Sequence, residues 1–238
     1  AASPLPTGKE CSRIAPNPMR VFLSYNNLIR AAALATVVTL MSLGRLVQGQ
    51  MPLLLFIPAT FGLMMFVGGA VTAWGQSAGM PGVVTDRGTL RRGTAVALTL
   101  SLIVLPLRLL WLEALVRRAL LSASSPSVHA LAYPDSLRGI AALILWSCGF
   151  QVLFTQAAPM SLGARLTRSQ PVAIAICVTI QAYIFHQQLL TSGIHDFGLL
   201  LVLSTLGRTL VGCLVFSRYG LLPTMLLAAG TNVHLFFS

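Results

Sequence analysis

Five polar side chains stand inside long apolar stretches of this sequence, where a charged or hydrogen-bonding group is costly. They are two arginines, a glutamine, a histidine and an asparagine: Arg108, Gln181, His186, Arg208 and Asn232. In a membrane such residues line an ion pathway, face a cavity or pair with one another. A histidine can also ligate a metal or a pigment. The alternatives are a buried structural pair, an arginine that snorkels to an interface, and a histidine that only satisfies a hydrogen bond.

The remaining ionisable residues show no catalytic pattern. Glu113 and Arg117 are spaced i, i+4 with the acid first, which predicts an ion pair on a helix. His195 lies beside Asp196, and His234 is close to the end of the chain. The nucleophile-elbow and zinc-protease motifs are absent, and the four cysteines have no metal-ligand spacing. We therefore predict no catalytic residue, no metal site and no cofactor. Bound lipids are expected, and a bound pigment is the alternative that the sequence leaves open.

The elements that must position these residues are apolar runs, each about as long as the roughly 20 residues that cross a bilayer as a helix. The last three runs are separated only by TSGIHD and SRY, which predicts antiparallel hairpins. The predicted spans are 31–47, 51–74, 94–112, 137–157, 171–190, 197–216 and 220–237. The fold class is thus all-α: a polytopic bundle of about seven transmembrane helices, with a membrane domain at 30–238.

Composition supports this class. Hydrophobic residues make up 55% of the chain, charged residues 9%, and the mean hydropathy is +0.81, which a water-soluble domain would not show. The net charge of +11 lies between the spans and not on one basic face, so nucleic acid is not an expected partner. Ten basic residues fall on the N-terminal side of the predicted topology and four on the other, which places the N-terminus on the cytoplasmic, matrix or stromal side.

The predicted connections have distinct compositions. Residues 1–29 are polar and rich in proline, which predicts an extended arm that lies along a neighbouring chain. The segment 75–92 reads as a surface loop, and 159–170 as a link between the fourth and fifth spans. The chain starts at AASPLPTGKECSR and has one lysine against fifteen arginines. We interpret these features as those of a nucleus-encoded organellar protein from which a targeting peptide has been removed.

One resemblance covers about residues 150–234. The segment LGARLTRSQPVAIAICVTIQAYIFH ends at His186, Gly207 and Gly212 follow in the next span, SRYGLLP forms a turn, and the last helix holds Asn232. This order resembles the CAAX-prenyl-protease and bacteriocin-processing family of intramembrane proteins. The family's paired glutamates are not matched, because FTQAAPM stands in their place. LEALVRR offers Glu113 and Arg117 as a substitute, one span too early. The resemblance therefore implies the family's scaffold without its general base.

A second resemblance is local. IQAYIF, which contains Gln181, is similar to a helix of subunit a of ATP synthase, and SLGARL is similar to the helix that carries that family's essential arginine. The resemblance implies a proton-conducting subunit. Arg165 precedes Gln181 by 16 positions, whereas Arg138 would give a longer spacing without the surrounding motif.

From these features we expect a non-catalytic accessory subunit of an energy-transducing membrane complex, respiratory or photosynthetic. Its partners would be other membrane subunits and lipids. The membrane would be the mitochondrial inner membrane or the thylakoid, with the N-terminus on the matrix or stromal side, and a bacterial inner membrane is the alternative. The competing functions are a proton-conducting subunit and an intramembrane hydrolase.

Overall fold

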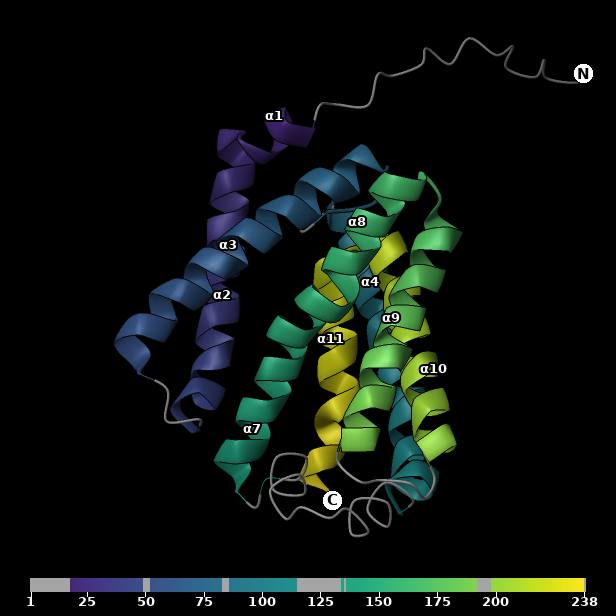
Figure 1. Ribbon diagram of the computed structural model, residues 1–238. Helices are drawn as coiled ribbons and strands as arrows, with labels where there is room; N and C mark the ends of the chain where they lie inside the picture. Colours follow the sequence, from purple (N-terminus) through teal and green to yellow (C-terminus); the bar gives the residue numbers. More distant parts are fainter. Residues whose placement is uncertain are drawn as a thin grey trace, which may run out of the picture.

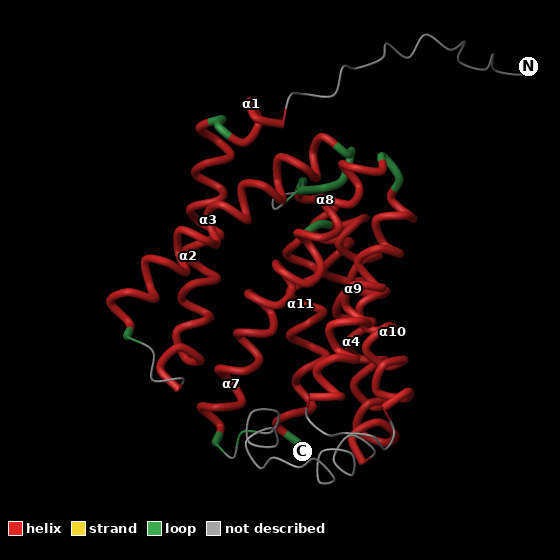
Figure 2. The backbone as a smooth tube through the Cα atoms, in the orientation of Figure 1, coloured by secondary structure: helices red, strands yellow, loops and turns green. Residues whose placement is uncertain are grey.

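The computed structural model describes residues 18–48, 52–82, 86–114, 134, 136–191 and 198–237, and every regular element in these ranges is a helix (Figures 1 and 2). The predicted all-α class is therefore confirmed. The elements are α1 (Pro18–Phe22), α2 (Tyr25–Gln48), α3 (Leu53–Ser77), α4 (Arg87–Leu107), η1 (Arg108–Leu112), α7 (Leu137–Trp146), η2 (Ser147–Ala157), α8 (Ala158–Thr167), α9 (Gln170–Thr191), α10 (Gly198–Tyr219), α11 (Leu221–Asn232) and η3 (Val233–Phe236).

Six helices are long and apolar enough to cross a membrane, which identifies an integral membrane protein. The predicted seventh span is the shorter helix Leu221–Phe236, which runs alongside the others in Figure 1. The fourth span is longer than predicted, because α7, η2 and α8 continue to Thr167 and absorb most of the segment that we expected to be a link. Pro159 lies inside this continuous helix, directly after the π turns of η2. The helix ends where Arg168 adopts a left-handed conformation (φ 54°).

The expected arm is partly helical. Residues 1–17 lie outside the described residues, but α1 and the start of α2 occupy positions that we predicted to be extended. Contacts with α3 hold this region: the Asn27 amide donates to the Gly69 carbonyl at 3.3 Å, and the Phe22 ring packs edge-on against Phe66. Gly69 leaves the space that the Phe22 ring fills. These contacts come from a helix far along the chain, so local composition did not reveal them.

The predicted loop at 75–92 is also shorter, because α3 runs to Ser77 and α4 begins at Arg87. Asp86 is the N-cap of α4, and its carboxylate accepts the backbone N–H of Thr89 at 2.9 Å. Hydrogen bonds from Thr89 hold the pKa of the Asp86 carboxyl below its ordinary value, because they favour the charged form. This acidic cap is one of the sequence signals that fixes where α4 starts.

The helices form two sets: α2 and α3 make a pair, and the remaining spans make a group beside it. α2 packs on α3, while α11 packs on α4, α10 and η2, and α8 packs on α3 and α9 (Figure 1). Phe216, Met64 and Leu153 are among the largest fully buried side chains of the core. A side chain at Gly93 of α4 would collide with Tyr219 and Pro223, so α4 and α11 approach closely there. Three cysteines, Cys148, Cys177 and Cys213, are buried.

Candidate functional site: a polar cluster inside the bundle

Ser147, at the start of η2, joins three helices inside the apolar core. Its hydroxyl donates to the Gln151 side-chain oxygen at 2.7 Å, one turn further along η2. The same oxygen accepts from the Asn232 amide of α11 at 3.0 Å and from the Arg208 guanidinium of α10 at 3.3 Å. Ser147 and Asn232 are both buried. Since lipid offers no competing hydrogen bonds, this shared hydroxyl ties η2, α10 and α11 together.

An acid and a histidine meet close to this centre. The Glu113 carboxylate, directly after η1, lies 3.6 Å from Nε2 of His234 in η3, and both residues are buried. Nδ1 of His234 lies 2.9 Å from the Thr231 carbonyl and donates to it in the Nδ1–H tautomer. His234 therefore has the hydrogen-bonding role that we considered for a membrane histidine. The pair joins the end of the third span to the end of the last helix.

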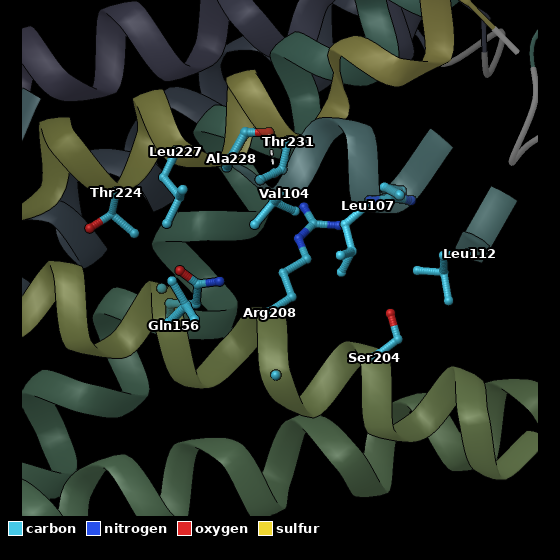
Figure 3. A pocket seen from close by; sticks show the side chains of 14 residues that line it. Val104, Leu107, Leu112, Gln156, Ser204, Arg208, Thr224, Leu227, Ala228 and Thr231 are labelled. Atoms are coloured by element: carbon cyan, nitrogen blue, oxygen red, sulfur yellow. Dashed lines mark hydrogen bonds between the residues drawn. The ribbon is translucent and has the colours of Figure 1, made fainter. Parts of the chain in front are cut away.

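The two intramembrane arginines approach one another. The charges of Arg108 and Arg208 are close enough to interact, and both act on His234. Both side chains also line one cavity, which Figure 3 shows. We define the residues of these contacts together as the polar cluster: Arg108, Glu113, Ser147, Gln151, Arg208, Asn232 and His234. Glu113, Ser147, Asn232 and His234 of this cluster are buried, whereas Gln151 and Arg208 are exposed on the flank of the bundle.

Two stretches of π-helix carry much of this cluster. η1 begins at Arg108, and η2 spans Ser147–Ala157. A π-turn widens the helix and shifts the register of the side chains that follow, and such turns are frequent at functional sites. In η2 the wider turns accompany the inward placement of Ser147 and of Gln156, which is also buried. The cluster is thus built where helix geometry departs from the regular α form.

Three of the five predicted residues come together, and two do not. Arg108, Arg208 and Asn232 belong to the polar cluster. Gln181 and His186 lie on α9, where Gln181 is partly buried and His186 is exposed, and neither contacts the cluster. The predicted partner of Glu113, Arg117, lies outside the described residues, as do His195 and Asp196. Glu113 lies against His234 and not against the exposed His186, so the contact that would restore a hydrolase site is absent from the described residues.

We did not single out Ser147, Gln151 or Gln156, although a signal was present. They are polar residues within one apolar span, and Ser147 and Gln151 are one helical turn apart. Among the described residues, no group of three or more histidine, cysteine or acidic side chains is placed to hold a metal ion. The chemistry that this cluster can perform is hydrogen bonding, proton exchange at Glu113 and His234, and attraction of an anion by the arginines.

The comparisons with known proteins give no relative: no family model matches the chain, no curated protein is detectably similar, and no solved structure matches the fold.

Proposed function

We propose that the chain is a non-catalytic accessory subunit of a larger membrane complex. The observation that carries this proposal is a row of polar side chains on the outer face of α9. Thr179, Tyr183 and His186 are spaced i, i+4, i+7 and are all exposed, Tyr183 to 64%. They lie between the tenth and seventeenth residues of a 22-residue span. Polar groups at such depth are usually placed against protein or water and not against lipid.

Within the described chain, nothing covers this face. The opposite side of α9, which includes Ala173, Cys177 and Leu189, is buried, and α9 packs with it against α8, α10 and η2. A hydroxyl, a phenol and an imidazole in one row suit a spanning helix of another subunit that offers carbonyl or side-chain hydrogen-bond partners. The proposed occupant of the α9 face is therefore a partner transmembrane helix.

The wider setting of the proposal is an organellar energy-transducing membrane, either the mitochondrial inner membrane or the thylakoid. Tyr183 belongs to IQAYIF, the segment similar to subunit a of ATP synthase, and the arginine-rich composition suits an organellar protein. In the described residues, Arg87, Arg91 and Arg168 are among the arginines at the end of the bundle where α2 begins, and Arg45 and Arg138 are at the other end. This asymmetry supports the matrix or stromal side for the N-terminus.

The test removes hydrogen bonding from the α9 face while keeping its size. In the triple variant Thr179→Val, Tyr183→Phe and His186→Leu, the tagged chain should no longer co-purify with its complex and should migrate alone on a native gel. The control replaces exposed threonines on two other spans, Thr36→Val and Thr99→Val. If the triple variant stays in the complex as firmly as the control does, the proposal is wrong.

One observation favours a second candidate function, a proton-conducting subunit. Arg208 is the eleventh of the 22 residues of α10, near the middle of the membrane, and the titratable pair Glu113 and His234 lies toward the end that carries the C-terminus. An arginine at mid-depth beside groups that exchange protons is an arrangement that proton pathways use. Proton flux into vesicles that contain the complex should then be abolished by Arg208→Gln, and unchanged flux would exclude this function.

A further inference from the structure

A cavity of about 350 Å³ lies between α4, α10 and α11, and two arginines, Arg108 and Arg208, are among the residues that line it (Figure 3). Apolar side chains form most of its wall, including Val104, Val211 and Leu227. In Figure 3 Arg208 reaches into this space, with Gln156 to one side and Ser204 to the other. A largely apolar cavity of this size with a few polar groups is typical of a small-molecule site.

The polar groups of the cavity have unused hydrogen-bonding capacity. In the described part of the chain, the Arg208 guanidinium donates to the Ser147 hydroxyl at 3.3 Å, and no carboxylate pairs with it. Gln156 is 8% exposed, and its side-chain oxygen is buried without a hydrogen-bond partner among the described residues. A buried amide oxygen that lacks a donor is rare in native proteins and points to a missing ligand group. The ligand must therefore accept from a guanidinium and be able to donate to an amide.

A carboxyl group meets both demands. In its neutral form one carboxyl group makes both bonds at once, because its carbonyl oxygen accepts from the arginine while its O–H donates to the amide oxygen. The apolar wall indicates that the rest of the ligand is a hydrocarbon chain. Arg208 lies about 15 Å from either end of α10, given a rise of about 1.5 Å per residue. The phosphate of a bilayer lipid is held at the membrane surface, about that far away, whereas a free acid can enter this depth in its neutral form.

The cavity also has an opening that faces the membrane. A side chain built at Gly207, which lines the cavity beside Arg208, would meet nothing within 4 Å. Gly207 is exposed, and Leu107 on the facing helix is 67% exposed. The opening therefore lies between α4 and α10, on the flank of the bundle that the membrane surrounds. We propose that this cavity binds a free long-chain carboxylic acid, which enters from the membrane and places its carboxyl group between Arg208 and Gln156.

Binding can be measured with the purified full chain in detergent, using radiolabelled palmitate. Wild type should bind one palmitate saturably. Arg208→Gln should bind it at least tenfold more weakly, because the charged partner is lost. Gly207→Leu should weaken binding similarly by filling the opening, and it leaves the polar cluster intact. Gly62→Leu is the matched control, since Gly62 also has nothing within 4 Å but lies on α3, away from the cavity, so its binding should equal that of wild type.

Two further ligands separate the head group from the chain. Hexadecanol has the chain without the acid and should not compete with palmitate. Dipalmitoyl phosphatidic acid has an anionic head group that is held at the surface, and it should compete no better than the neutral alcohol. Equal palmitate binding by wild type, Arg208→Gln and Gly207→Leu would overturn the proposal, and so would effective competition by either ligand. None of these results bears on the α9 face, so the subunit proposal stands or falls separately.

Discussion

The substitution Ser147→Ala tests whether the polar cluster holds the bundle together. It removes one hydroxyl that accepts from Asn232 and Arg208 and donates to Gln151. Hydrogen bonds between membrane helices average about 0.6 kcal/mol and reach about 1.7 kcal/mol. Two such bonds are lost, and a buried amide and a guanidinium keep their unmet donors, which adds to the cost. We expect the free energy of unfolding to fall by about 1 to 3 kcal/mol.

The assay is reversible unfolding in mixed micelles, followed by tryptophan fluorescence. Ser42→Ala is the matched control, because Ser42 is equally buried but its hydroxyl bonds only to the Val38 carbonyl of its own helix, at 2.7 Å. That bond does not join helices, so its loss should be nearly neutral. If Ser147→Ala is no more destabilising than Ser42→Ala, the shared hydroxyl does not hold the helices and this reasoning is refuted.

A double-mutant cycle sharpens the same test. Combining Ser147→Ala with Asn232→Ala should cost less than the sum of the two single changes, since both remove the same 3.0 Å bond. We expect a coupling energy of about 0.6 to 1.7 kcal/mol. A coupling energy of zero would show that the two residues are buried as neighbours without a bond that contributes to stability.

Three further predictions follow from the geometry. Gly212→Ala should destabilise the fold and displace Gln156, because the added carbon would lie 2.5 Å from the Gln156 side-chain oxygen; a crystal or cryo-EM structure of the variant checks this. Asp86→Ala should lower the unfolding temperature at pH 7. The folded-state pKa of Asp86 is depressed, so the difference from wild type should shrink as the pH falls below about 4 and vanish below the folded pKa. Cysteines placed at Gly79 and Thr191, on opposite ends of the bundle, should be labelled from opposite sides of the membrane by an impermeant reagent.

The spans were predictable because lipid imposes a length and a composition on every crossing. Their ends were not, because the ends depend on contacts between distant segments. Residues 18–29 are polar enough to read as an arm, yet Asn27 bonds to Gly69, 42 residues along the chain. Residues 159–167 contain Pro159 and polar side chains, yet they continue the preceding helix, which changes from π to α turns just before the proline.

The sequence alone could identify residues of the site only where one residue is energetically unfavourable in a membrane by itself. A charge inside an apolar run identifies Arg108 and Arg208 without any knowledge of their neighbours. Ser147 has no charge that would single it out, and its partners Arg208 and Asn232 lie 61 and 85 residues away along the chain. Gln181 and His186 show the opposite problem. Polar and apolar residues are spread around α9, so its sequence alone does not tell which residues face inward.

The free-energy cost of holding Arg208 inside the membrane connects the polar cluster to the cavity beside it. A charged side chain at the centre of a membrane helix costs about 2.5 to 3.5 kcal/mol, and one interhelical bond offsets about 0.6 kcal/mol on average. Among the described residues, its guanidinium donates to the neutral Ser147 hydroxyl, and the nearby charge of Arg108 adds repulsion. Something else must therefore stabilise the guanidinium. The cavity that it borders is the place where a carboxyl ligand fits. Arg208→Leu would separate the two roles: it should raise stability in the absence of ligand and abolish the stabilisation that palmitate gives to wild type.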